Sequence, residues 1–235
     1  SAVIVGVSAF APPPRDKHLL AHCTARIYHF GYSSIIMQAL FTVYIVMLNM
    51  ILSSFSDAAV TVLGLYYKLQ GFFFIPLIGL QTCIVPMISY NFTRGNYERS
   101  RDTMNISMLV SAAFMIIGII CFVGAPRTLV RLFSDSAQVM EIGEKAFPII
   151  GTSFISAVFS LMLPVFFQAI GRGVPSLMLS LTRQIFVLVP VFWIFSKIGL
   201  NYTWIAFPVA ETVAGAVGLT LYAQQLKRWH VGFIS

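Results

Sequence analysis

The feature that most constrains this chain is a series of long apolar runs separated by short polar segments. Of its 235 residues, 58% are hydrophobic and 10% are charged, whereas an ordinary soluble domain is about 25% charged. A helix rising about 1.5 Å per residue crosses the roughly 30 Å hydrocarbon core in about 20 residues. We therefore predict an all-α membrane protein, a bundle of about six transmembrane helices.

The apolar runs give the bounds of the predicted spans. They cover residues 27–52, 59–90, 104–124, 146–170, 174–196 and 202–226. The second span exceeds thirty residues and must tilt, kink or project beyond the bilayer, and Pro76 and Pro86 are natural kink points. Between the third and fourth spans, a mixed-charge loop predicts a short interfacial helix near residues 127–133.

The ends of the chain suggest a larger parent protein. Residues 1–11 are apolar but too short to span a bilayer, and they lack the basic n-region of a signal peptide. We interpret them as the end of a preceding transmembrane helix, which makes the chain a fragment or a processed half. Residues 12–26 begin with three prolines and predict an interfacial cytoplasmic linker, 27–226 the six-helix lobe, and 227–235 a cytoplasmic tail.

Loop charges orient the bundle. Cytoplasmic loops carry an excess of Lys and Arg, and one side has nine of these residues against four on the other. Both ends of the six-helix unit are therefore predicted to face the cytoplasm, with the chain as a multi-pass protein of the plasma membrane in contact with lipid. Because the net charge of +7 is confined to these loops, it does not indicate nucleic-acid binding.

Three charged residues fall inside spans, namely Lys68, Arg183 and Glu211. Each would cost about 2.5–3.5 kcal/mol at mid-bilayer on insertion scales, so all three need an explanation. Lys68 and Glu211 both lie some nine residues from the outer side, on the order of 12–15 Å deep. We predict that they form a buried pair, which either fixes helix packing or lets Glu211 bind the coupling ion. Arg183 is interpreted as a snorkelling or helix-locking residue.

Polar and aromatic stripes give candidate cavity residues. Gln38, Thr42 and Asn49 share one face of the first span, and the fourth span carries a similar stripe that includes Ser160. Such stripes form either interhelical hydrogen bonds or the wall of a wet cavity. Phe159 and Phe166 are added as candidates, because adaptable aromatic walls suit large cationic or amphiphilic ligands. On the sixth span, glycines at helical spacing below Glu211 predict close approach of another helix.

The sequence carries no HExxH, GxSxG, P-loop or GxGxxG motif, and its four histidines lie at or outside the span ends. We therefore expect a protein that is not an enzyme and that holds no metal or resident cofactor. Without a nucleotide site, uphill transport would draw on a gradient of H+ or Na+.

Three stretches resemble a known family. They are FIPLIGLQTCIVPMISYNFTRGNYERSRD at residues 74–102, FQAIGRGVPSLMLSLTRQIFVLVPVFWIF at 167–195, and WIAFPVAE at 204–211. Together they resemble the last six helices of the multidrug and toxic compound extrusion (MATE) family. The first looks like the family's proline and glycine helix with its Tyr-Asn exit, and the second like its Gln-Ala-x-Gly-Arg turn and the polar helix that follows.

The resemblance implies a twelve-helix transporter of two six-helix lobes that exchanges drug-like cations for sodium ions or protons. This chain would be the C-terminal lobe, and its partner would be the N-terminal lobe or a second copy of the chain. Some members place acids in the first and fourth helices of this lobe, where this chain offers Gln38 and no acid. That departure is similar to the branch whose proton-coupling aspartate lies in the N-terminal lobe.

Three hypotheses for the function follow. The first is a lobe of an ion-gradient-driven antiporter that exports cationic or amphiphilic drug-like compounds. The second is a lobe of a lipid-linked oligosaccharide flippase, which would call for a more cationic cavity than one Lys and one Arg supply. The third is a structural or dimerising half without transport of its own.

Overall fold

The computed structural model describes residues 35–36 and 38–231. The predictions for residues 1–11, for the linker 12–26 and for the start of the first span lie outside the described residues. The chain divides into two compact units, residues 1–36 and 37–235. Only two residues of the first unit are described, so everything below concerns the second unit.

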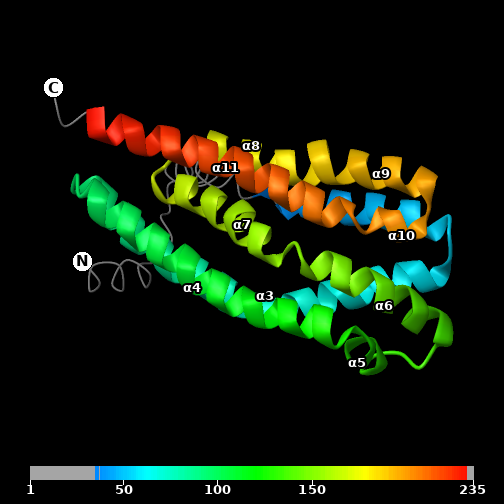
Figure 1. Cartoon of the computed structure of the whole chain (residues 1–235). Helices are drawn as coiled ribbons and strands as arrows, with labels where there is room; N and C mark the ends of the chain where they lie inside the picture. The colour runs from blue at the N-terminus through cyan, green and yellow to red at the C-terminus, as the bar shows by residue number, and fades with distance from the viewer. Residues whose placement is uncertain (1–34, 37, 232–235) are drawn as a thin grey trace, which may run out of the picture. The chain divides into compact units, whose positions relative to one another are not determined.

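The described part of this unit consists of helices joined by short turns and contains no β-strand (Figure 1). The first helix covers Gln38–Ser53. It is followed by α3 (Asp57–Thr93), α4 (Tyr97–Gly124), α5 (Pro126–Arg131), α6 (Ala137–Gly151), α7 (Phe154–Ala169), α8 (Gly173–Leu181), the π-helix η1 (Thr182–Leu188), α9 (Val189–Ile198), α10 (Leu200–Thr203) and α11 (Ala206–Val231). The prediction of an all-α fold is confirmed.

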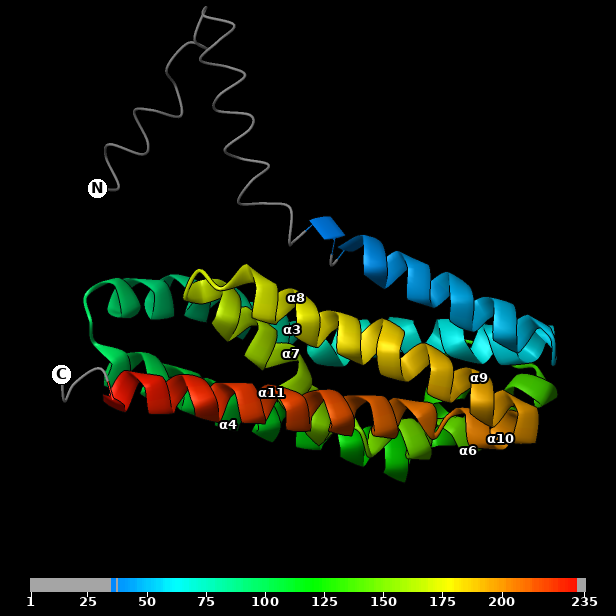
Figure 2. The same cartoon turned by 90° about the horizontal axis from the view of Figure 1, so that it is seen from above.

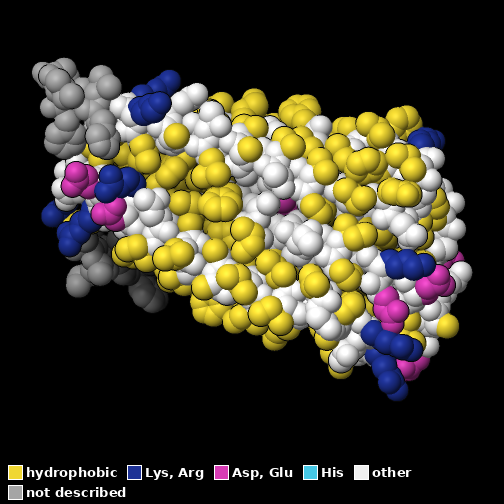
Figure 3. Space-filling model, viewed as in Figure 1, with side chains coloured by type: hydrophobic (Ala, Val, Ile, Leu, Met, Phe, Trp, Pro, Cys, Tyr) yellow, Lys and Arg dark blue, Asp and Glu magenta, His cyan; other side chains and the backbone are white. Residues whose placement is uncertain are grey.

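Four helical runs are long and apolar enough to cross a membrane, namely α3, α4, residues 173–198 and residues 200–229. The helices α6 and α7 would form a fifth span if the bent pair crosses as one. The described part of the remaining predicted span is the shorter apolar helix Gln38–Ser53. Charged side chains gather at the two ends of the face seen in Figure 3, and the broad middle is mostly apolar. This distribution is that of a membrane protein.

The helix α3 is a single uninterrupted helix of 37 residues, although it contains Pro76 and Pro86. Its N-cap residue is Ser56, whose side chain accepts a hydrogen bond of 3.2 Å from the Ala59 amide and so caps the first turn. At about 1.5 Å per residue the helix is about 55 Å long, which exceeds the hydrocarbon core. The second span therefore projects beyond the bilayer, one of the outcomes predicted for it.

Two helices start earlier than the sequence predicted. The third span was placed from residue 104 but α4 begins at Tyr97, and the fourth was placed from residue 146 but α6 begins at Ala137. The charged residues in these stretches do not end the helices, because they lie on exposed sides and pair with one another. Lys145 Nζ lies 2.9 Å from Glu141 Oε1, for example. The predicted interfacial helix near residues 127–133 corresponds to α5.

The fourth predicted span is broken in its middle, which the sequence analysis did not predict. The helices α6 and α7 are bent by 57°. At the break, the Thr152 hydroxyl donates to the Ile149 carbonyl at 2.7 Å and the Ser153 hydroxyl to the Ile150 carbonyl at 2.6 Å. Hydroxyls that bond to nearby backbone carbonyls compete with the helix ladder and accompany bends.

The helix α7 lies between α11 and α4 and also contacts α3 and α8 (Figures 1 and 2). Its side chains Phe154, Val158 and Met162 are fully buried. The glycines of α11 permit the close packing that the sequence predicted, since a Cβ on Gly218 would lie 2.8 Å from Leu163 Cδ1 of α7. Burying α7 on all these sides places any polar residue it carries at the centre of the unit.

Candidate functional site

The central polar feature of the unit is an ion pair between η1 and α11. Arg183 Nη1 lies 3.0 Å from Glu211 Oε1, and the two side chains are only 12% and 10% exposed. The other ion pairs of the described residues are at least one-third exposed on both sides. An exposed pair contributes little, whereas removing one partner of a buried pair leaves a costly isolated charge. Arg183 and Glu211 therefore have to be considered together.

Glu211 is also held from α7. The Ser160 hydroxyl donates a hydrogen bond to Glu211 Oε2, the oxygen that does not face Arg183. One turn away, Ser156 and Thr212 form a second α7–α11 hydrogen bond of 3.2 Å between their hydroxyl oxygens. Both carboxylate oxygens of Glu211 thus have partners, and those partners come from two different helices.

Three tyrosines lie close to this pair. Tyr44 of the first helix and Tyr66 and Tyr67 of α3 are all within electrostatic range of Arg183. The ring centroids of Tyr44 and Tyr67 are 6.4 Å apart, and those of Tyr66 and Tyr67 are 5.1 Å apart. The Tyr67 hydroxyl is buried and lies close to Tyr44. No group of the described residues is placed to form a well-aligned hydrogen bond with it. The three tyrosines therefore belong to the surroundings of the ion pair.

The predicted pairing of Lys68 with Glu211 is wrong. Lys68 is exposed, and the described residues include no ion pair to it. Depth was counted along the helix, but successive side chains turn by about 100° around its axis. Tyr66 and Tyr67, the neighbours of Lys68 in α3, lie near the ion pair, whereas Lys68 is on another face of the helix and is exposed.

Arg183 replaces Lys68 as the partner of Glu211. The ion pair holds the Arg183 guanidinium against the Glu211 carboxylate. Arg183 does not snorkel, and it joins η1 to α11 across the interior. The π-helical turns of η1 bear this residue, and π-helical turns inside α-helices are frequent at functional sites.

The other cavity candidates are spread over the unit. Gln38 and Thr42 are exposed on the first helix, while Asn49 is partly buried and donates to its own helix at the Ile45 carbonyl, 3.0 Å away. Phe159 is partly buried against Gly215 of α11. Phe166 is fully buried, so it belongs to the core and does not line a cavity. Among the candidates, only Ser160 lies at the ion pair.

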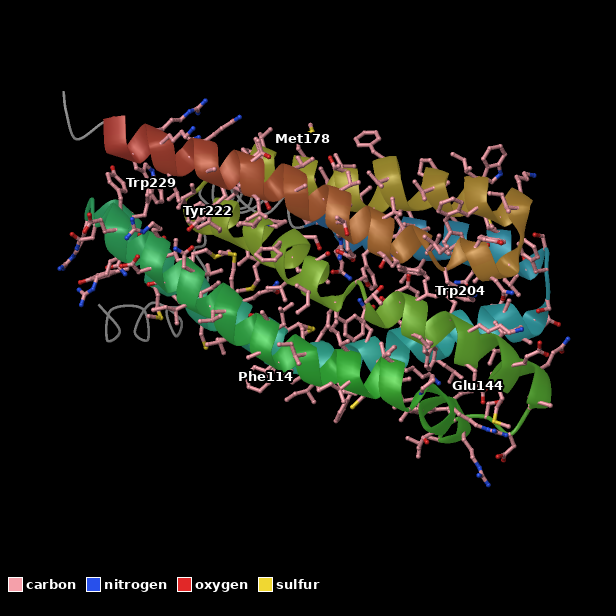
Figure 4. All side chains as sticks on the ribbon, in the orientation of Figure 1. Phe114, Glu144, Met178, Trp204, Tyr222 and Trp229 are labelled. Carbon is pink, nitrogen blue, oxygen red and sulfur yellow. The ribbon has the colours of Figure 1, made fainter. Side chains whose placement is uncertain are left out.

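The polar stripe of the fourth predicted span makes interhelical hydrogen bonds. Besides Ser156 and Ser160, which contact α11, Gln168 Nε2 donates to Ser176 Oγ of α8 at 3.1 Å. In the C-terminal half of α11, the Tyr222 hydroxyl donates to Asn105 Oδ1 of α4 at 3.1 Å. Tyr222 and Trp229 lie on the side of α11 that faces α4 (Figure 4). Of the two alternatives for the stripe, the structure favours helix packing.

Sequence reasoning missed the three tyrosines around the ion pair. Tyrosine in a span is usually found at the membrane interface, and Tyr44, Tyr66 and Tyr67 stand well inside the predicted apolar runs. That position was a usable signal of a polar interior. No comparable signal marked the π-helix, since its sequence TRQIFVL is compatible with an ordinary α-helix.

The arrangement is one buried carboxylate that faces one buried guanidinium, so the pair is neutral overall. Without the charge of Glu211, Arg183 would be an unpaired buried cation and would need water or a new partner. No group of three or more His, Cys, Asp or Glu side chains that could hold a metal ion exists among the described residues.

The sequence was compared with known protein families and curated proteins. The MatE family model matches residues 33–194. The multidrug export protein MepA of Staphylococcus haemolyticus is 23% identical over 193 residues, covering 82% of this chain and 42% of that protein. MepA of Staphylococcus saprophyticus is 21% identical over 196 residues, covering 83% and 43%. This chain therefore spans less than half the length of these curated relatives.

Solved structures share the fold. An outward-facing multidrug resistance MATE transporter of the MOP superfamily matches with a TM-score of 0.83 at 19% identity, over 94% of this chain and 49% of that one. A MOP superfamily transporter from Pyrococcus furiosus, described as having a binding pocket of reverse polarity, matches with a TM-score of 0.81 at 19% identity, over 95% and 49%. In both cases this chain corresponds to about half of a transporter.

Proposed function

Because this chain belongs to the MATE family of membrane transporters, we propose that it forms one half of a multidrug exporter in the cell membrane. The exporter would use an H+ or Na+ gradient to move cationic or amphiphilic compounds out of the cell. The other half would be an N-terminal lobe or a second copy of this chain. The observation that carries the proposal is the Arg183–Glu211 pair, the one buried ion pair among the described residues.

The pair supports a coupling role because it joins two helices and a third helix contacts it. Arg183 sits in the π-helix and Glu211 in α11, with Ser160 of α7 on the second carboxylate oxygen. Neutralising Glu211 would leave Arg183 buried without a counter-charge, so a different packing of η1 against α11 would become favourable. Binding of the coupling ion would thereby change the conformation of the lobe.

Of the two coupling ions, a proton suits these groups better. A proton needs one carboxylate oxygen, and Ser160 can turn its hydroxyl to accept as well as donate. A metal cation needs several oxygen ligands, and one of the two carboxylate oxygens of Glu211 already faces Arg183 while the other accepts from Ser160. Arg183 would also repel an arriving cation.

The flippase hypothesis receives less support. It calls for a cationic cavity that holds a pyrophosphate-linked substrate, but Arg183 is neutralised by Glu211. Lys68 is then the one mid-span charge among the described residues that lacks an ion-pair partner. A single lysine is a weak site for a multiply charged anion.

The test uses the protein expressed from its complete gene in a drug-sensitive host. Efflux of ethidium is measured with imposed pH or sodium gradients, for the wild type, for Glu211→Gln and for the matched control Glu144→Gln. Glu144 is a carboxylate of α6 that is paired with Arg127 of α5 at 3.2 Å and is partly exposed. We expect Glu211→Gln to lower the pH-driven rate by about tenfold or more, with Glu144→Gln within about twofold.

Unchanged efflux with unchanged pH dependence in Glu211→Gln would reject the coupling role of this residue. Absence of export of any cationic dye by the wild type would reject the exporter itself.

A further inference from the structure

The hydroxyl of Ser160 in α7 has two acceptors within reach. It donates to Glu211 Oε2, and it also lies 3.2 Å from the carbonyl oxygen of Ala157 in the preceding turn of its own helix. The side chain is buried, with 4% of its surface exposed. A serine hydroxyl carries one hydrogen and two acceptor lone pairs. It therefore donates to one of these two oxygens at a time, and its own oxygen is able to accept when it has turned to the other.

The two carboxylate oxygens of Glu211 are not equivalent. Glu211 Oε1 accepts from Arg183 Nη1 at 3.0 Å, and a guanidinium has five donors and no acceptor. A proton on Oε1 would thus point at another N–H group. Oε2 instead faces the hydroxyl oxygen of Ser160, which is able to accept. A proton that neutralises Glu211 is accommodated on Oε2, while Oε1 continues to accept from Arg183 as a carbonyl oxygen.

Few other groups act on this carboxylate. Arg183 of η1 supplies the counter-charge. Tyr44 of the first helix and Tyr66 of α3 lie within electrostatic range of Glu211, and Tyr67 lies within range of Arg183. The helices α7 and α8 carry no charged side chain. The charged residues of α6 and α9, which also contact α11, are at least partly exposed, namely Glu141, Glu144, Lys145 and Lys197.

We propose that Ser160 is a positioning residue for the coupling proton, whose hydroxyl reverses its direction with the charge of Glu211. When Glu211 is ionised, Ser160 donates to Oε2. When a proton from the gradient binds to Oε2, the new O–H group donates to Ser160 Oγ, and Ser160 turns its own hydrogen to the Ala157 carbonyl. Only rotation about the Cβ–Oγ bond of Ser160 is needed, because it keeps its proton throughout.

This inference rests on the proposed coupling role of Glu211 and names the group that receives its proton. It explains why the acid is held from α7 as well as from η1, since both charge states keep a hydrogen bond on each oxygen. A buried polar group that loses its partner costs about 1–3 kcal/mol. A hydroxyl that serves both states avoids that cost at either end of the exchange.

The competing interpretation is that Ser160 only fastens α7 to α11. Ser156 supplies the comparison, because it lies one turn away on α7 and bonds to Thr212 of α11 at 3.2 Å between hydroxyl oxygens. That bond joins the same two helices and involves no carboxylate. A residue that merely fastens the helices should therefore behave like Ser156, whereas a residue that holds the proton should change the carboxyl group itself.

The experiment is infrared difference spectroscopy of the purified complete protein on acidification. The carbonyl stretch of protonated Glu211 is identified as the carboxyl band that the wild type shows and Glu211→Gln lacks. This stretch moves to higher wavenumber when the carboxyl group loses a hydrogen bond. We expect such a shift in Ser160→Ala, and the wild-type position in Ser156→Ala and in Ser160→Thr, which keeps a hydroxyl able to bond to the preceding turn.

A Glu211 band that Ser160→Ala leaves in place, or that Ser156→Ala or Ser160→Thr moves as far, overturns the assignment of Ser160 and leaves the coupling role of Glu211 standing. A wild type without any band that depends on Glu211 contradicts both proposals. Folding of each variant is checked by its elution in detergent. Should Glu211→Gln not fold, the wild-type spectrum minus that of Ser160→Ala still shows a displaced carboxyl band if the proposal holds, and a flat difference overturns it.

Discussion

At the residue scale, Glu211 is defined by its partners. One carboxylate oxygen faces Arg183 and the other accepts from Ser160, on a side chain that is only 10% exposed. Desolvating two charges offsets much of their attraction, so a buried pair adds little net stability when intact. The pair matters because the loss of one of its two charges leaves the other buried and unpaired, which strongly destabilises this packing.

Removing Arg183 should therefore be worse than removing both charges. Arg183→Gln leaves the Glu211 carboxylate buried without a counter-charge, and we expect a loss of about 3–5 kcal/mol in the free energy of unfolding. The double variant Arg183→Gln/Glu211→Gln should recover a large part of that loss. Thermal unfolding midpoints of the purified protein in detergent report both effects.

Lys145→Gln serves as the control, because its exposed pair with Glu141 is worth about 0–1 kcal/mol. If the double variant were as unstable as Arg183→Gln alone, the two residues would not act as a unit, and the assignment of the pair would be wrong.

At the element scale, α7 is the helix around which the others pack, and its bent junction with α6 brings Ser156 and Ser160 to α11. The junction depends on a close approach between α6 and α4. A Cβ added at Gly151 would lie 2.8 Å from Phe122 Cβ and 3.4 Å from Val123 Cγ2. The first of these atoms is bonded directly to the backbone of α4 and cannot turn aside.

Gly151→Ala should consequently destabilise the protein by about 1–3 kcal/mol through overpacking. The matched control is Gly124→Ala, because a Cβ at Gly124 at the end of α4 meets nothing within 4 Å, and its effect should stay within about 0.5 kcal/mol. Unfolding midpoints in detergent compare the two. A Gly151→Ala protein as stable as the control would show that the α4–α6 contact is looser than described.

The sequence was sufficient for elements that depend on local composition. Apolar runs predicted the long helices because a span needs about 20 apolar residues whatever its neighbours are, and the glycines of α11 predicted its close approach to another helix. The break between α6 and α7 and the π-helix η1 were not predictable in this way, because each depends on packing against other helices. The N-terminal ends of the helices α4 and α6 were placed too late in the sequence, because charged residues outside the bilayer do not interrupt a helix.

The candidate site was only half predictable for a related reason. Mid-span charges identified Lys68, Arg183 and Glu211, but counting paired Glu211 with Lys68, whereas the structure pairs it with Arg183. Which of the two cations faces the acid depends on how α3 and η1 are rotated about their axes. No residue count supplies that rotation, and the π-helix alters it locally around Arg183.

At the scale of the whole molecule, the chain matches about half of each solved transporter to which it is similar. Loop charges predict that both ends of the six-helix unit face the cytoplasm. Lys145 of α6 would then lie outside and Lys227 near the end of α11 would lie inside.

Cysteine labelling tests this orientation. In a protein whose own cysteines have been replaced, Lys145→Cys should react with a membrane-impermeant maleimide in intact cells. Lys227→Cys should react only after the membrane is opened. The reverse pattern would invert the orientation, and labelling of both residues in intact cells would contradict the predicted number of spans between them.

The central claim, that Glu211 exchanges its charge during transport, is tested most directly by proton release on substrate binding. Purified complete protein in weakly buffered detergent solution is mixed with ethidium, and the released protons are measured with a pH indicator dye. We expect Glu211→Gln to release about one proton fewer per bound ethidium than the wild type and Glu144→Gln, because the amide that replaces the Glu211 carboxyl group has no acidic proton to give up. Undiminished proton release from Glu211→Gln would contradict the account.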